Sequence, residues 1–95
     1  MVTHVVIFTW VADVAERKVE QFRAALEQLA HELVDFCEIH HGPDLHFRDG
    51  NGDYALIASF SDDADWAAYQ AHPSHKTFVR DFVAPIQASR VAIQF

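Results

Sequence analysis

Two kinds of hydrophobic pattern divide the first part of the chain. Residues Thr3 to Trp10 are almost all β-branched or aromatic, which is typical of a strand. Apolar side chains then recur at steps of three and four and predict a helix of about six turns. Asp13, followed three residues later by Glu16, resembles a capping box and predicts the start of this helix. The apolar stripe of the helix consists of Val19, Phe22, Leu26, Leu29 and Leu33.

The opposite face of that helix carries charged side chains. Glu20, Arg23 and Glu27 are spaced so that weak ion pairs can form along the surface. Exposed pairs of this kind contribute little to stability and seldom carry chemistry. We therefore interpret this face as solvated.

Two further strands are predicted in the middle of the chain. Residues Phe36 to Phe47 and Asp53 to Ser61 flank the sequence Asp49-Gly50-Asn51-Gly52, whose composition favours a hairpin turn. The second strand is apolar on both faces. These residues therefore predict a pair of neighbouring antiparallel strands.

The last third of the chain predicts two short helical segments and a strand. Ser61, Asp62 and Asp63 can cap a helix that runs through Trp66 to Gln70. Pro73 suits the first position of a second segment, which Pro85 ends. In residues Arg90 to Phe95, the large apolar side chains of Val91, Ile93 and Phe95 alternate with Ala92 and Gln94, which indicates a final strand. The second segment carries one apolar stripe, formed by Phe78, Val79, Phe82 and Val83.

This order of elements defines the fold class. It predicts one α+β domain over residues 1–95 with a ferredoxin-like βαββαβ fold, in which helices cover one face of a four-stranded antiparallel sheet. The other face then exposes apolar residues, at Val6, Phe8, Leu56 and Ala58 or at their neighbours. A second copy of the same sheet is the economical cover. We therefore expect a homodimer whose two sheets enclose a cavity.

The amino-acid composition limits the kinds of binding partner that we expect. The 95 residues are 51% hydrophobic, which supports a folded core, and the formal net charge of −7 disfavours nucleic acids and anionic membrane surfaces. Cys37 is the single cysteine, so no internal disulfide can form, and we interpret it as a small core residue. No stretch resembles an export signal or a membrane span. A cytoplasmic protein is expected.

Three segments resemble the stress-responsive dimeric α/β-barrel family. The first is Thr3-His4-Val5-Val6-Ile7-Phe8, and the second is Tyr54-Ala55-Leu56-Ile57-Ala58-Ser59-Phe60-Ser61-Asp62. The third, Ala68-Tyr69-Gln70-Ala71-His72-Pro73-Ser74-His75, contains a Tyr-x-x-His-Pro-x-His block that is the most specific part of the match. The resemblance spans nearly the whole chain. It implies a ferredoxin-like homodimer that holds a small apolar ligand.

The same resemblance suggests a chemistry. Polyketide cyclases of this family, of the type that makes olivetolic acid, perform an intramolecular aldol condensation without a metal or organic cofactor. By likeness to them, His75 would be the catalytic base, Tyr69 would position it, and His4 would line the pocket. A further pocket histidine of those enzymes is matched here by Ala55, so the same substrate is not implied.

The residues themselves make this chemistry reasonable. Pro73 would place His75 in the first turn of a helix, where the helix dipole disfavours a positively charged imidazole. A neutral imidazole can take a proton from a carbon between two carbonyl groups, and a phenol such as Tyr69 can hold the ring or donate to the enolate. The alternative is that Tyr69 and His75 only join two helical segments.

Other candidate residues have weaker signals. His72 either lines the substrate pocket or, because it precedes Pro73, caps the helical segment. Trp66 could stack on a flat ligand. His72 and His75 have a spacing that metals use, but no third ligand is evident, so we expect no metal. In the His40-His41 pair, the two rings should point to opposite faces of a strand, one of them to solvent.

Three function classes stay open at this stage. The first is a cofactor-independent, polyketide cyclase-like enzyme that uses His75 and Tyr69, with substrate-binding roles for His4, His72 and Trp66. The second is a non-catalytic, stress-responsive protein of the same fold that binds a small apolar metabolite. The third is a cofactor-independent monooxygenase.

Overall fold

The computed structural model describes residues 1–95 as a four-stranded antiparallel sheet with helices on one side. Its strands are β1 (Val2–Trp10), β2 (Glu38–Pro43), β3 (Tyr54–Phe60) and β4 (Gln87–Gln94), in the spatial order β2-β3-β1-β4. The helices are α1 (Glu16–Glu32), α2 (Asp63–Ala71) and α3 (Pro73–Phe78), and a π-helical turn, η1 (Val79–Val83), continues α3. The ferredoxin-like βαββαβ fold is confirmed.

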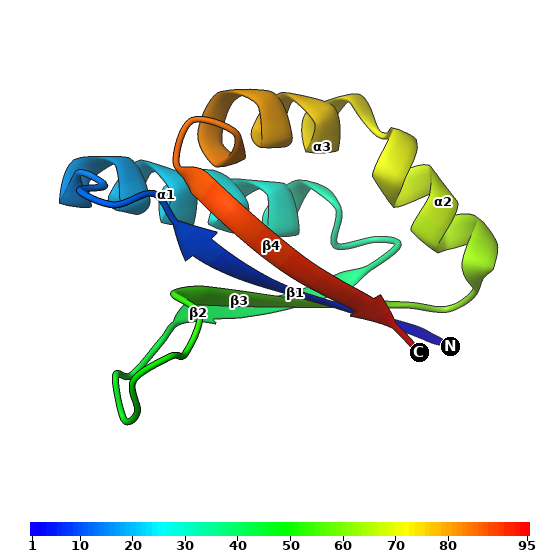
Figure 1. Cartoon of the computed structure of the whole chain (residues 1–95). Coiled ribbons are helices and arrows are strands. Elements are labelled where there is room, and N and C mark those ends of the chain that lie inside the picture. Colours follow the sequence, from blue (N-terminus) through cyan, green and yellow to red (C-terminus); the bar gives the residue numbers. More distant parts are fainter.

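All three helices lie over the same face of the sheet (Figure 1). Side chains of β1 alternate, so His4, Val6 and Phe8 turn towards the helices and are buried. Antiparallel pairing puts their partners on β3 and β4 on the same face; His4, for example, lies opposite both Ala58 and Gln94. The core fills the space between this face and the buried stripe of α1, which consists of Phe22, Leu26 and Leu29.

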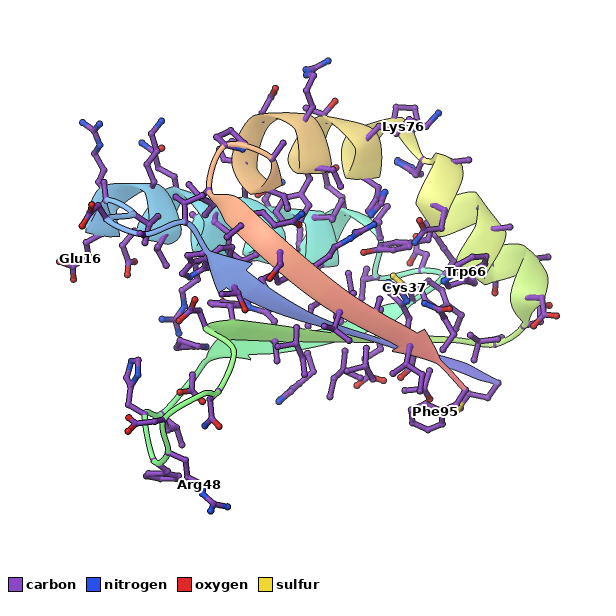
Figure 2. The ribbon with its side chains drawn as sticks, viewed as in Figure 1. Glu16, Cys37, Arg48, Trp66, Lys76 and Phe95 are labelled. Carbon is purple, nitrogen blue, oxygen red and sulfur yellow. The ribbon has the colours of Figure 1, made fainter.

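The opposite face of the sheet is uncovered and apolar. Ile7 is 43% exposed, Val91 is 70% exposed and Phe95 is 74% exposed; Ile57 and Ile93 are also exposed. Figure 2 shows Phe95 on the side of the sheet away from the helices. The sequence pointed to Val6, Phe8, Leu56 and Ala58 or their neighbours as the residues in need of cover. In the structure these four residues are buried against the helices, and their neighbours on the strands are the exposed ones.

The predicted start of the long helix is wrong. Ala15 occupies the N-cap position, no side chain caps the helix, and Glu16 is its first residue. Asp13 instead sits in a turn with a positive φ of 62°, a conformation that Asp tolerates better than most residues. The capping-box spacing was therefore present without the backbone geometry that makes it a cap.

The strand predicted over Phe36 to Phe47 is shorter at both ends. After Pro43 the chain leaves the sheet in a loop that projects beyond the uncovered face (Figure 1). The loop closes through a backbone hydrogen bond from Asp44 N to Asp53 O at 2.9 Å. Gly50 has a φ of 85°, and a Cβ on Gly52 would collide with the Ile7 side chain, so both positions require glycine.

The short helices begin largely as predicted. Asp62 caps α2 by accepting a hydrogen bond from the Asp65 amide at 2.9 Å, and His72 Nδ1 caps α3 by accepting from the Ser74 amide at 3.1 Å. Pro73 is the first residue of α3. None of the helices has the combination of length and apolar composition that a membrane crossing requires.

Candidate functional site

A cavity of about 200 Å³ lies between the helical face of β1 and β4 and the helices α2, α3 and η1. It brings together the residues singled out from the sequence on three separate elements: His4 on β1, Trp66 and Tyr69 on α2, and His75 on α3. In Figure 2, Trp66 lies on α2, near the end of the sheet where β4 finishes. The remaining walls are Val6, Phe8, Leu56, Gln70, Phe78, Val79, Val83, Arg90, Ala92 and Gln94.

Tyr69 and His75 are in direct contact. Their ring centroids are 4.4 Å apart with a tilt of 48°. Tyr69 is one of the most buried large side chains of the protein, and it also packs edge-on against His4 at 6.2 Å. The close Tyr69–His75 contact follows from the break between α2 and α3 at His72, which folds two adjacent helical segments back onto one cavity.

His4 is held from the neighbouring strand. The side-chain amide Nε2 of Gln94 donates a hydrogen bond to His4 Nδ1 at 2.9 Å. An amide nitrogen can only donate, so His4 Nδ1 accepts and the proton of the neutral ring is on Nε2. His4 also makes an edge contact with Trp66 at 6.4 Å between ring centroids. The ring is thus fixed in orientation and in tautomer.

Burial keeps both cavity histidines neutral. It lowers the pKa of His4, and the Arg90 charge lowers it further. Burial is also the main cause that lowers the pKa of His75; a backbone contact with Gln70 opposes it, while His4, Arg90 and His72 lower it further. Burial raises the pKa of Tyr69, so its hydroxyl stays protonated at neutral pH. A neutral imidazole and a protonated phenol are the states that acid–base chemistry needs.

Two buried nitrogens on this wall have no hydrogen-bond partner in the chain. They are Nδ1 of His75 and Nε1 of Trp66. Buried polar atoms are nearly always paired, since an unpaired one costs about 1–3 kcal/mol. Both belong to side chains that line the cavity. The arrangement therefore offers unfilled hydrogen-bonding capacity to a bound molecule.

His72 lies outside this cavity. Its ring stacks on Phe36, with centroids 6.0 Å apart, and its Nδ1 caps α3. The capping alternative seen in the sequence is thus what the structure shows for this ring. Cys37 is buried as expected, and burial raises the pKa of its thiol.

A second histidine–tyrosine pair was not found from the sequence. His41 Nδ1 lies 2.7 Å from the Tyr54 hydroxyl, and His41 Nε2 lies 2.6 Å from Glu27 Oε1, a close contact with a carboxylate. Glu27 had been assigned to the solvated face of α1, and its side chain is indeed 69% exposed. The ring of His40 is exposed, as the alternation predicted.

Arg90 and Gln94 are the other cavity residues that sequence reasoning missed. Both come from β4, and only the pairing of β4 with β1 brings them beside His4 and Phe8. No group of three or more His, Cys, Asp or Glu side chains is arranged to hold a metal ion. A larger hollow of about 370 Å³ between α1 and α3 has Glu32 as its single ionisable side chain.

This fold and site define a ferredoxin-like α/β-barrel protein. Residues 2–95 match the model of the family described as the stress responsive A/B barrel domain, and the chain belongs to that family. No functionally curated protein matches the chain.

Several solved structures are similar. A dimeric ferredoxin-like protein of unknown function from Thermobifida fusca is 34% identical, with a TM-score of 0.90 over 99% of this chain and 88% of that one. A hydroxynitrile lyase from Passiflora edulis is 20% identical, with a TM-score of 0.83 over 99% and 90% of the two chains. A putative antibiotic biosynthesis monooxygenase from Nitrosomonas europaea is 19% identical, with a TM-score of 0.77 over 100% and 96%. The last two likenesses establish the fold alone.

Proposed function

We propose that this protein is a homodimeric α/β barrel that binds a small carbonyl compound in the His4–Tyr69–His75 cavity and acts on it without a cofactor. His75 would be the base and Tyr69 the residue that positions it. One observation carries the proposal: His75 is neutral, packs on Tyr69 at 4.4 Å between ring centroids, and has a buried nitrogen without a partner. That combination is what a proton acceptor in a binding cavity requires.

The reaction class is carbon–carbon bond chemistry through an enolate. A neutral imidazole of His75 takes a proton from a carbon next to a carbonyl, leaving the electron pair on the enolate oxygen. The protonated Tyr69 hydroxyl donates a hydrogen bond to that oxygen. The enolate carbon then attacks a second carbonyl of the same molecule, and the proton returns from the imidazolium to the new alkoxide. This sequence is an intramolecular aldol addition that gives a β-hydroxy ketone. Removal of a second α-proton with departure of the hydroxyl group as water would complete the polyketide cyclase-like condensation.

The Passiflora protein supports this class of chemistry. That protein is a hydroxynitrile lyase, so in one protein of similar fold the barrel carries a lyase.

The uncovered sheet face supports the dimer. It presents a continuous set of apolar side chains, and the similar T. fusca protein is described as dimeric. Ile57→Glu would place a charge at the centre of that face, so we expect the variant to elute as a monomer in size-exclusion chromatography with light scattering. A protein that is monomeric before the substitution contradicts the dimer.

The catalytic proposal is tested by exchange of a carbon-bound proton for deuterium. Ethyl acetoacetate in heavy water supplies an acidic carbon between two carbonyl groups, and NMR follows its loss of proton signal. We expect the protein to accelerate exchange and His75→Gln to lose about 10²–10⁴-fold of that acceleration. His41→Gln is the matched control and should keep it. Equal exchange in wild type and His75→Gln contradicts the role of His75.

Two other functions have specific support. A non-catalytic binding protein is favoured by the small cavity with both apolar and polar lining residues, and it would hold ligand in native mass spectrometry with no proton exchange. A cofactor-independent monooxygenase is favoured by the likeness to the Nitrosomonas protein, and oxygen consumption with substrate would reveal it.

A further inference from the structure

The wall of the cavity has the opposite charge character to the rest of the protein. The chain carries 14 Asp and Glu against 7 Lys and Arg. None of those 14 carboxylates lines the cavity, whereas Arg90 does. An acidic protein thus places a permanently cationic group, on the exposed residue Arg90, beside the cavity that holds His4, Tyr69 and His75.

Arg90 is held at this wall by the sheet. It lies opposite Phe8 in the β1–β4 pairing, and Gln94 lies opposite His4. Arg90, Ala92 and Gln94 therefore face the helices in a row along the edge strand, and all three line the cavity. Ser89 and Val91 belong to the opposite face.

No carboxylate of the protein neutralises Arg90. The ion pairs of the chain are His41–Glu27, His46–Asp44 and Arg80–Asp81. The charge of Arg90 instead acts on the cavity histidines, where it contributes to the lowered pKa of His4 and of His75. A free guanidinium presents several donors in a fork that matches a carboxylate.

Three other polar groups of the wall also donate, whereas the neutral His75 is the acceptor of the proposed reaction. Trp66 Nε1 is a buried donor without a partner. Because Gln94 donates to His4 Nδ1, the proton of His4 is on Nε2. Tyr69 keeps its hydroxyl proton. A molecule that fills this cavity must therefore supply acceptors and, at Arg90, a negative charge.

We propose that the ligand of this cavity is a small organic anion: a short-chain 3-keto carboxylate with a further keto group as the acceptor of the aldol step, whose carboxylate pairs with Arg90 and whose 3-keto group lies among His4, Trp66, Tyr69 and His75. Acetoacetate, with one keto group, serves as a probe of binding. This inference rests on the proposed function and adds the substrate class. The volume of about 200 Å³ favours a short chain.

The pairing of the ligand carboxylate with Arg90 also couples binding to catalysis. The charge of Arg90 lowers the pKa of His75 in the empty cavity. A bound carboxylate screens that charge, so the pKa of His75 rises on binding and the imidazole becomes a stronger base. A neutral ligand of the same shape does not produce this rise.

The test compares two probes with the same number of non-hydrogen atoms. Acetoacetate is an anion, and 2,4-pentanedione is its neutral counterpart with a methyl group in place of the carboxylate oxygen. Each is titrated into the protein while NMR follows the imidazole signals of His4 and His75 and the indole N–H of Trp66. We expect acetoacetate to bind about tenfold more tightly, since it can form charged hydrogen bonds with Arg90, whose exposure to solvent keeps the gain modest.

Arg90→Gln should remove this preference by weakening acetoacetate about tenfold while leaving 2,4-pentanedione unchanged. Arg17→Gln, which removes the same charge from an exposed position on α1, should keep it. The histidine titration should also shift upward with acetoacetate and not with the diketone.

The outcomes separate this inference from the proposed function. If 2,4-pentanedione moves the His4 and His75 signals and acetoacetate binds no better, the anionic class is wrong and the ligand-binding cavity stands. If neither probe moves the cavity signals at any attainable concentration, both proposals fall. If Arg90→Gln weakens both probes equally, Arg90 acts on the shape of the cavity and the charge pairing is wrong.

Discussion

The protein contains two histidine–tyrosine pairs that are built from the same residue types but lie in different surroundings. In the first, His41 has both ring nitrogens in close contact with protein oxygens, one on Tyr54 and one on Glu27. In the second, the His75 ring lies against Tyr69 at a tilt of 48° and leaves Nδ1 unpaired beside a cavity. His41 Nε2 also makes no well-aligned hydrogen bond, so the pairs differ in the Glu27 carboxylate, which lies 2.6 Å from His41 Nε2 and has no counterpart at His75.

We interpret His41 as a structural link between elements, whereas His75 is the residue that we propose as the base. His41 connects β2 to β3 through Tyr54 and to α1 through Glu27, so its polar atoms hold three elements together. His75 connects only neighbouring segments of chain, and its side chain lines the cavity. Contact between a His and a Tyr is therefore uninformative by itself, and the groups around the two rings distinguish the pairs.

The largest expected effect is on the stability of the fixed pair. His41→Ala removes the partner of the buried Tyr54 hydroxyl and leaves a space against it, so we expect the free energy of unfolding to fall by about 2–3 kcal/mol. His75→Ala is the matched substitution in the second pair and should cost less, because its Nδ1 loses no hydrogen bond. Urea denaturation at one protein concentration measures both. Equal losses would break the distinction between the pairs.

The second prediction concerns pH. The pKa of His4 and of His75 is lower in the folded protein than the ordinary value of about 6.5, mainly because of burial. As pH falls below about 6.5, the unfolded chain takes up these protons first, so stability decreases towards the lower folded pKa values and is fully present above 6.5.

Thermal unfolding between pH 8 and pH 5 tests this. His75→Gln should make the loss of stability on acidification shallower, whereas His31→Gln, at an exposed position on α1, should leave the slope unchanged. An unaltered slope in His75→Gln would mean that His75 is protonated as easily in the folded protein as in the unfolded chain.

The smallest effect is expected at Glu27. Its side chain is mostly exposed, so its contact with His41 is screened by solvent, and Glu27→Gln should change the free energy of unfolding by less than about 0.5 kcal/mol. A loss as large as that of His41→Ala would show that the carboxylate, and not the Tyr54 hydroxyl, is the main partner of the ring. The same denaturation series measures it.

The sequence predicted the fold well because its signals are local. Strand composition in Thr3 to Trp10, the apolar stripe of α1 and the Pro73 start of α3 each depend on neighbours a few residues apart. The Tyr69–His75 contact could be predicted for the same reason, because the two residues are only six positions apart. Where a local signal was wrong, as at Asp13, the spacing was right and the backbone conformation differed.

The rest of the site is non-local and could not be predicted in this way. His4 and Gln94 are 90 positions apart, and their hydrogen bond exists only because β4 pairs with β1 in one register. A shift of one residue would turn Arg90, Ala92 and Gln94 to the other face. The contacts of His41 likewise join β2, β3 and α1. Nothing in the local sequence of α1 therefore indicated that Glu27, on its solvated face, contacts His41.

The π-helical turn over Val79–Val83 has an evolutionary consequence. Its bond from the Ala84 amide to the Val79 carbonyl spans one residue more than an α-helical turn, at 2.9 Å, so the turn holds one residue in excess of a regular helix. Both Val79 and Val83 line the cavity. Loss of a single codon here would restore the regular helix and rotate every later residue of the segment by about 100°. Relatives with and without that codon would be expected to differ in cavity shape while sharing the same barrel.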